Sequence, residues 1–141
     1  MTSVIVDASV IVACAIADGK ARRALLTAAG VEFYAPAFVQ EEVRRRSPKI
    51  IALSGSGPTV ISTLLDDLFA RVAIVPREAF ETRLREATVL VARASAQGDE
   101  DYVALALVLA AAIWTYDKDF HPIKGIRVVS REQVELGLLQ Q

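Results

Sequence analysis

Two short apolar segments, far apart in the sequence, each end at an aspartate. Residues 4–6 are Val-Ile-Val and precede Asp7, and residues 112–116 are Ala-Ile-Trp-Thr-Tyr and precede Asp117. Short runs rich in β-branched and aromatic residues are typical of strands that are buried on both faces of a sheet. We therefore predict two buried strands, each of which places a carboxylate at its C-terminal end.

The remaining pattern alternates between strands and helices. Further strands are predicted at residues 31–35, 72–75 and 126–129, and helices at residues 9–17, 20–29, 37–46, 59–69, 77–96, 100–111 and 131–139. Parallel strands need helical crossovers, so this order predicts an α/β fold, a three-layer α/β/α sandwich with a mostly parallel central sheet. Ligands bind such sheets beyond the carboxyl ends of the strands, where Asp7 and Asp117 fall.

Prolines and glycines predict the limits of the central helical region. Pro36 fits the first turn of the helix at residues 37–46, and Pro48 lies just past its end. Residues 50–53 then lead into Ser-Gly-Ser-Gly-Pro at 54–58, the clearest loop in the sequence.

Length and composition favour one domain. The 141 residues are 53% hydrophobic and 23% charged, and they contain no long polar, Gly/Ser-rich or Pro-rich tract that could act as a linker. A chain of this size can bury its own core, so we expect a single domain over residues 1–141.

Charge and cysteine content limit the classes of function. Sixteen basic and seventeen acidic side chains give a formal net charge of −1, so any nucleic-acid site must be local rather than a property of the whole molecule. The single cysteine, Cys14, lies in an apolar run, cannot form an internal disulfide and fits a reducing compartment. The chain enters an apolar strand at once, and no apolar stretch reaches the roughly 18 residues of a membrane span. We expect a soluble cytoplasmic protein.

Four acids are candidates for a site, and each has an ordinary alternative. Asp7 could hydrogen-bond local N–H groups in a turn, Asp99 could cap the next helix, and Asp117 could belong to a surface turn. Glu42 stands beside Glu41 on a predicted helix, where successive side chains point about 100° apart, so only one of them can face a given site.

Taken together, the four acids indicate a metal site. Carboxylates that lie close together repel one another and resist ionisation unless a cation neutralises them. Mg²⁺ or Mn²⁺ fits, because hard divalent cations prefer carboxylate oxygens, whereas one Cys and one His cannot form a usual zinc site. We interpret His121 as an ordinary loop histidine. A basic group beside Glu42 could hold phosphates or could be a solvated helix face; it comprises Arg44, Arg45, Arg46 and Lys49.

The sequence resembles a PIN-domain nuclease, of the VapC-type toxin and solitary prokaryotic PIN-domain subgroups, over nearly its whole length. The resemblance rests on Val-Ile-Val-Asp-Ala-Ser at residues 4–9, on Ala-Pro-Ala-Phe-Val-Gln-Glu-Glu-Val at 35–43, and on the stretch from Asp99 to Phe120. In this pattern the second acid precedes an aliphatic residue, which selects Glu42 over Glu41.

The resemblance also assigns the remaining site residues. It places the third acid at Asp99, not at Glu100 or Asp101, although Asp101 could assist. Ser9 and Thr115 match the hydroxyl positions of the family, and Asp119 matches an acid that only some members use. Asp7, Asp99 and Asp117 are then the implied metal ligands, with Glu42 as the fourth catalytic residue.

The implied activity is that of a Mg²⁺- or Mn²⁺-dependent endoribonuclease. Metal-activated water would hydrolyse a phosphodiester bond of single-stranded RNA, leaving a 5′-phosphate and a 3′-hydroxyl. The resemblance further implies a homodimer and, in the toxin branch, a small antitoxin partner. Basic surface for RNA would come from dimerisation or from Arg44, Arg45, Arg46 and Lys49.

Two other classes remain as alternatives. An aspartyl-phosphate protein of the receiver or haloacid-dehalogenase kind also places Asp at strand ends, but it requires a second acid close after the first, where this chain has Ala8 and Ser9. A non-catalytic binding module could keep the fold without the chemistry, yet all four acids are present.

Overall fold

A parallel sheet forms the centre of the protein. The computed structural model describes residues 1–94, 99–117, 123–130 and 133. Among these residues five strands pair in the order β3-β2-β1-β4-β5, and all pairs are parallel. The strands are β1 (Thr2–Val6), β2 (Val31–Pro36), β3 (Val72–Val75), β4 (Ala112–Trp114) and β5 (Val128–Val129).

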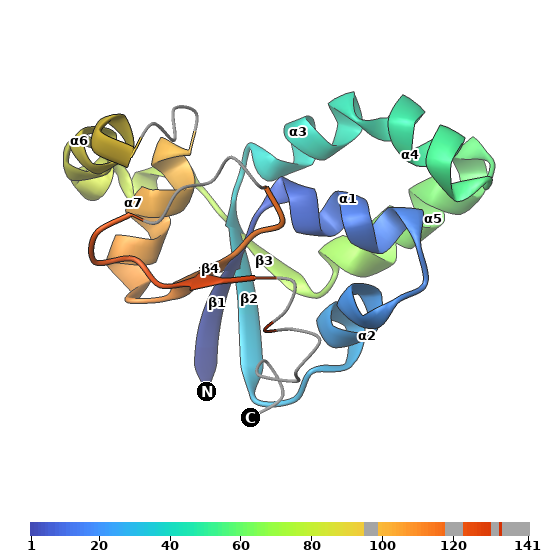
Figure 1. The fold of residues 1–141 in the computed structure, drawn as a ribbon, viewed down its shortest axis with the longest axis horizontal. Helices are drawn as coiled ribbons and strands as arrows, with labels where there is room; N and C mark the ends of the chain where they lie inside the picture. Colours follow the sequence, from blue (N-terminus) through green and yellow to red (C-terminus); the bar gives the residue numbers. More distant parts are fainter. Residues whose placement is uncertain (95–98, 118–122, 131–132, 134–141) are drawn as a thin grey trace.

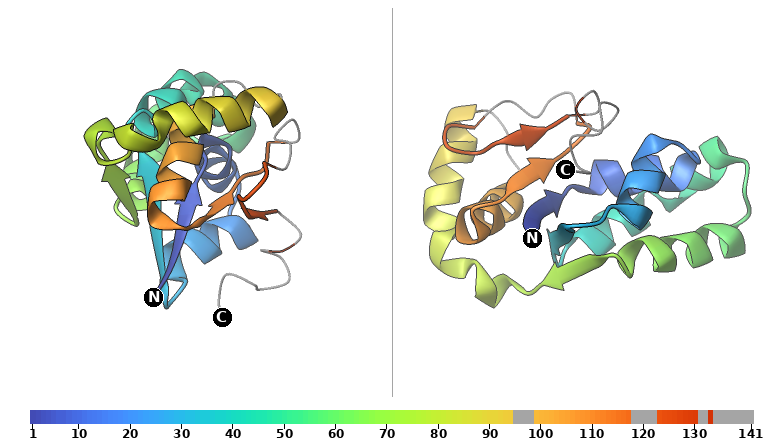
Figure 2. Two further views of the ribbon diagram at one scale, coloured as in Figure 1. Left: turned by 90° about the vertical axis from the view of Figure 1, so that its left-hand side faces the viewer. Right: turned by 90° about the horizontal axis from the view of Figure 1, so that it is seen from below.

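Helices cover both faces of the sheet and form the outer layers of an α/β/α sandwich (Figure 1). One layer holds α6 (Leu84–Ala94) and α7 (Glu100–Leu109). The other holds α1 (Ala8–Ile16), α2 (Lys20–Thr27), α3 (Val39–Arg45), α4 (Ser47–Ser54) and α5 (Pro58–Phe69). Figure 2 shows the two layers on opposite sides of the strands. The predicted three-layer architecture is confirmed.

The centre of the sheet explains the continuous apolar runs in the sequence. Val4, Ile5 and Val6 on β1 are at most 1% exposed, because β2 and β4 flank this strand and helices cover both of its faces. Trp114 on β4 is fully buried and packs against Phe33 of β2, with ring centroids 5.8 Å apart. The residues that follow β1 and β4 are therefore held by a rigid core.

One helix was missed by the sequence analysis. The sequence pattern predicts that Pro48 lies past a helix end, but Pro48 lies in the first turn of α4, and residues 50–53 are helical rather than a lead into a loop. Proline is tolerated at both places, since its missing N–H costs nothing in a first turn. Arg46 separates α3 from α4, and Gly55 ends α4 in the left-handed conformation, with φ 73°.

The single helix predicted for residues 77–96 is wrong in its first third. Two 3₁₀ turns, η1 (Arg77–Ala79) and η2 (Glu81–Arg83), precede α6. Phe80 stands between the turns with φ −125°, outside helical values, and its side chain is fully buried. Burial of this ring in the core outweighs the local helical pattern.

Smaller differences concern the last strands and the C-terminal end. The strands predicted at 112–116 and 126–129 are shorter, ending at Trp114 and beginning at Val128. The helix predicted at 131–139 lies outside the described residues. Within the described parts of the chain, no helix combines the length and the apolar character needed to cross a bilayer.

The C-terminal end of α7 offers a test of backbone strain. Ala110 ends this helix with φ 50° and ψ 44°, a left-handed conformation that costs an L-residue roughly 1–2 kcal/mol and that glycine adopts freely. We expect Ala110→Gly to raise the free energy of unfolding by about 0.5 kcal/mol, after the larger chain entropy of glycine is subtracted. Ala70→Gly is the matched control, because Ala70 ends α5 with a right-handed φ of −62° and should lose stability. Urea unfolding that shows equal losses for both would contradict this.

Candidate active site

The strand order reverses between β1 and β4. Strands β2 and β3 continue the sheet on one side of β1, whereas β4 and β5 continue it on the other. Val6 pairs with Trp114, and the backbone N–H of Asp7 donates to the carbonyl oxygen of Trp114 at 3.0 Å. Asp7 and Thr115 therefore leave the sheet side by side. In open α/β sheets ligands bind at such a reversal, outside the carboxyl ends of the strands.

Asp7 is the centre of a hydrogen-bond network that joins these two strand ends. Its Oδ2 accepts from the hydroxyls of Thr115 at 2.7 Å and Ser9 at 2.8 Å, and its Oδ1 accepts from the N–H of Ala8 at 2.8 Å. The Ser9 hydroxyl oxygen in turn accepts from the N–H of Tyr116 at 3.0 Å. Asp7 is buried, so these bonds hold a carboxylate in a fixed orientation at the edge of the core. The network explains why hydroxyl residues stand at positions 9 and 115.

Glu42 reaches the same region from α3. Its Oε1 accepts a hydrogen bond from the Tyr102 hydroxyl of α7 at 2.7 Å. Burial raises the pKa of Glu42, the Tyr102 hydrogen bond lowers it, and the negative charge of Asp7 raises it. Glu41 is exposed instead and forms an ion pair with Arg45 at 3.2 Å. Of the two adjacent glutamates, only Glu42 turns toward Asp7.

Asp99 lies in a crowded acidic environment. It occupies the residue before α7, yet its side chain makes no capping hydrogen bond, so helix capping does not account for it. Burial, followed by the charges of Asp7, Asp117 and Glu42, raises the pKa of Asp99 to about 7. The four predicted acids, which come from the junction of β1 and α1, from α3 and from the segments that precede α7 and follow β4, are thus electrostatically coupled.

Asp117 and Asp101 differ in their surroundings. The backbone N–H of Asp117 donates to the Thr115 hydroxyl at 3.2 Å, and the Asp117 side chain is exposed while its charge reaches Asp99. Asp101 instead lies near Arg77: burial raises its pKa, the charge of Arg77 lowers it, and that of Glu100 raises it. The candidate acid Asp119 and the loop histidine His121 lie outside the described residues.

The donor set fits a hard divalent cation by its chemistry. Every candidate group is a carboxylate, each ionised carboxylate accepts through about four lone-pair sites, and their mutual repulsion is relieved when a cation binds. Within the described residues, however, no three acidic, His or Cys side chains are arranged to hold a metal ion directly. A bound cation would therefore draw the carboxylates closer than they stand here.

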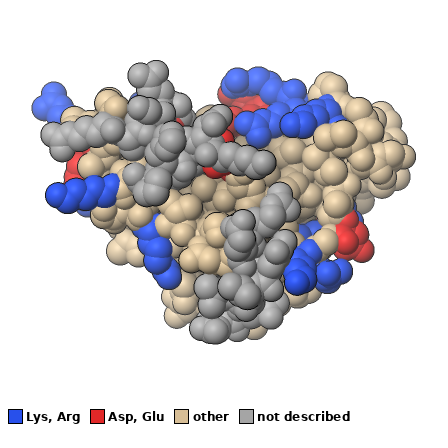
Figure 3. Space-filling view, in the orientation of Figure 1, with Lys and Arg blue, Asp and Glu red and all other residues tan. Residues whose placement is uncertain are grey.

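Basic side chains gather beside the acids on α3 and α4. Figure 3 shows Lys and Arg over this part of the surface, next to acidic atoms. The charges of Arg46 and Arg45 lower the pKa of Glu42, so both lie near the acidic cluster. Arg44 lines a groove between α3 and α5 instead, and Lys49 is exposed on α4. The predicted basic group is therefore divided between two surfaces.

Tyr102 is a site residue that the sequence analysis missed. It is 1% exposed, as a core residue would be, but its hydroxyl donates to Glu42. Burial, and then the charges of Asp7 and Glu42, raise the pKa of this hydroxyl, so it stays protonated and donates. Tyr102 lies in the first turn of α7, three residues after Asp99, and this closeness in the sequence to a candidate acid was the available signal.

The Tyr102 hydroxyl therefore offers a test of how Glu42 is positioned. Because Tyr102→Phe removes a hydrogen bond that lowers the pKa of Glu42, we expect this pKa to rise and the acidic limb of the pH–activity profile to move to higher pH. The fall in kcat at pH 7 should be modest, about three- to tenfold, roughly the worth of a hydrogen bond to a charged group. Tyr34→Phe is the control, since the Tyr34 hydroxyl donates to the exposed Glu32 and contacts none of the four candidate acids. An unshifted profile would contradict the proposed role of Tyr102.

Comparison with known proteins identifies the family. A family model described as PIN domain matches residues 5–138. Nine chains of known structure match. One of them, the crystal structure of PAE2754 from Pyrobaculum aerophilum, has a TM-score of 0.67 and 16% sequence identity, over 99% of this chain and 91% of that one. At this identity the likeness concerns the fold alone. No curated protein matches the chain. The family match spans nearly all of the sequence, and the chain belongs to the PIN-domain family.

Proposed function

We propose that this protein is a Mg²⁺- or Mn²⁺-dependent endoribonuclease that hydrolyses single-stranded RNA. PIN domains are generally nucleases that need a divalent metal. The observation that supports this activity here is the group of four electrostatically coupled carboxylates at the reversal of strand order, where burial, and then the charges of the other acids, raise the pKa of Asp99 to about 7. Repulsion of this kind lowers stability unless a cation offsets it, so a fold that keeps it has a use for a cation.

Asp7, Asp99 and Asp117 would hold the metal, and Glu42 would orient water beside it. A divalent cation, when bound, acidifies water and offsets the negative charge that develops on the phosphate. Ser9 and Thr115 keep the Asp7 carboxylate in place through their hydroxyls. Asp119 remains a further candidate, as the resemblance implied.

Single-stranded RNA is the proposed substrate because basic side chains that can bind phosphates lie beside the acidic cluster, on a chain that has no overall positive charge. The chain as a whole has a net charge of −1, and Arg45 and Arg46 stand close enough to Glu42 to affect its pKa. These two cations can contact phosphates that flank the scissile bond, with Arg44 and Lys49 as further candidates. An exposed backbone reaches a surface site of this kind more readily than a duplex does.

We also propose partners and a cellular location for this protein. A homodimer would add basic surface, and a small antitoxin protein would block the acidic site if the chain is a toxin. A cytoplasmic location fits an RNA substrate and the lone Cys14, which is fully buried and whose pKa burial raises to about 12.

The test is a cleavage assay on mixed single-stranded RNA oligonucleotides. We expect 5′-phosphate products with Mg²⁺ or Mn²⁺ and none with chelator. Sequencing of the product ends would define the preferred sequence. Duplex RNA and single-stranded DNA of the same sequence are the substrate controls. Equal cleavage in chelator, or equal cleavage of duplex RNA, would contradict the proposal.

A further inference from the structure

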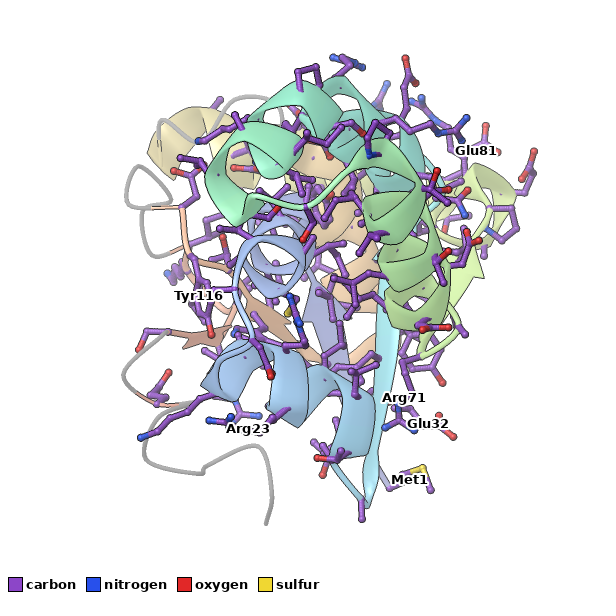
Figure 4. All side chains as sticks on the ribbon, turned by 90° about the vertical axis from the view of Figure 1, so that its right-hand side faces the viewer. Met1, Arg23, Glu32, Arg71, Glu81 and Tyr116 are labelled. Carbon is purple, nitrogen blue, oxygen red and sulfur yellow. The ribbon has the colours of Figure 1, made fainter. Side chains whose placement is uncertain are left out.

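A separate groove lies between α1, α2 and the end of β4. It has a volume of about 360 Å³. The described residues that line it are Ala13, Ala17, Gly19, Lys20, Ala21, Arg23 and Tyr116. Figure 4 shows Tyr116 and Arg23 on the same side of the molecule, with Arg23 on α2. None of these lining residues is acidic and two of them, Lys20 and Arg23, are cations; the nearest acid in the chain, Asp18, is exposed between Ala17 and Gly19.

The walls of the groove combine small side chains with two cations. Lys20 and Arg23 are three residues apart on α2, a spacing that places both on one side of that helix, and Ala13 of α1 and Ala17, which follows α1, line the groove with small side chains. Neither cation forms a salt bridge with any described residue. Arg22, in contrast, donates to the carbonyl oxygen of Cys14 at 2.7 Å and so has a structural role. Lys20 and Arg23 remain available to an anion.

Tyr116, which forms the aromatic wall of the groove, connects the groove to the proposed active site. Tyr116 lies between Thr115 and Asp117 in the chain, and its N–H donates to the Ser9 hydroxyl. Its ring is partly exposed and packs edge-on against Trp114, with centroids 5.9 Å apart and an interplanar angle of 79°. Packing against a buried tryptophan restrains the ring, and a restrained aromatic ring is a suitable platform for a nucleobase.

We propose that this groove is a nucleotide subsite for single-stranded RNA. A base next to the scissile phosphate stacks on Tyr116, and Lys20 and Arg23 contact the phosphates that follow it. The subsite rests on the proposed nuclease function, and it would add contacts to the strand beyond those proposed for Arg45 and Arg46. An acidic peptide would satisfy the cations, but the aromatic wall and the direct continuity with the acidic site favour a nucleic acid.

Binding in chelator tests the subsite without the need for catalysis. We would measure fluorescence anisotropy of a labelled single-stranded RNA with wild type, the double variant Lys20→Ala/Arg23→Ala, Tyr116→Leu and Tyr116→Phe. The double variant should weaken binding about tenfold and reduce the slope of log K against log salt by about 1 to 2. Tyr116→Leu should weaken binding about five- to tenfold. Tyr116→Phe keeps the ring and should bind RNA as tightly as wild type does. Arg85→Ala, an exposed cation on α6, is the control.

The outcomes separate the subsite from the nuclease function. If wild type binds RNA through these residues but cleaves none with metal, the proposed activity fails and the subsite stands. If RNA is cleaved while all variants bind as wild type does, the subsite is wrong. Equal binding of a polyglutamate peptide, dependent on Lys20 and Arg23, would assign the groove to acidic peptides and overturn the proposal. Thermal unfolding of each variant identifies any loss of binding that is only a loss of fold.

Discussion

Replacement of Asp7 by Asn is expected to reduce RNA cleavage by at least about 100-fold while the protein remains folded. Asn has the shape of Asp and keeps one carbonyl oxygen that can accept from the Ser9 or Thr115 hydroxyl, so the link between β1 and β4 survives. The variant removes the negative charge that is coupled to both Glu42 and Asp99. Metal affinity should therefore fall together with activity.

Cleavage and metal binding should be measured on the same preparations. Calorimetric titration with Mn²⁺ should give weaker binding for Asp7→Asn, and circular dichroism should show an unchanged fold. Asp67→Asn is the matched control, because Asp67 is exposed on α5 and takes no part in the acidic cluster. Cleavage by Asp7→Asn at the wild-type rate would remove Asp7 from the mechanism, and full Mn²⁺ affinity would remove it from the metal site.

The sheet could be predicted from sequence because its central strands are buried on both faces. The runs before Asp7 and Asp117 are short, largely apolar and rich in β-branched and aromatic residues, which is typical of strands in the core of a parallel sheet. The order of strands did not follow from the same pattern. It depends on how five segments pair in space, and the sequence placed Asp7 and Asp117 at one edge without showing that β1 and β4 are neighbours.

Prediction of the helix boundaries from local sequence failed at Pro48 and at Phe80. Pro48 favours both the position after a helix and the first turn of the next one, so α4 was not separated from α3 by the sequence. Phe80 breaks a helical pattern because its ring is buried by distant parts of the chain, which no local spacing records. Tertiary contacts decided both cases.

The acidic cluster was predictable as a set, but its supporting contacts were not. Glu42 could be separated from Glu41 only by the family pattern, and the structure adds the physical reason, the hydrogen bond from Tyr102. That bond joins residues sixty positions apart, which a single sequence does not show. The arrangement of the carboxylates around a cation also depends on the cation itself, because their repulsion keeps them apart in its absence.

Replacement of Asp99 by Asn is expected to stabilise the metal-free protein at neutral pH. The pKa of Asp99 in the folded state is about 7, above its ordinary value of 3.8. The folded state therefore binds this proton more tightly than the unfolded state, and wild-type stability should fall as pH rises from about 4 to about 7. The asparagine side chain carries no charge at any pH, so most of this dependence should disappear in the variant, with a smaller part remaining from Glu42, whose pKa is also raised.

The difference between the two proteins should be absent near pH 4 and largest above pH 7. Asp99 is only half-buried and solvent screens its charge, so we expect a gain on the order of 1 kcal/mol at pH 8, below the full linkage value. Chemical unfolding in chelator across this pH range measures it, with Asp67→Asn as the control. Mn²⁺ should reverse the order, since wild type gains stability by binding the ion and the variant loses a ligand. A variant that is less stable than wild type at pH 8 in chelator would show that burial and the neighbouring acids do not penalise the Asp99 charge, and the four carboxylates would then lose the physical basis for a shared cation.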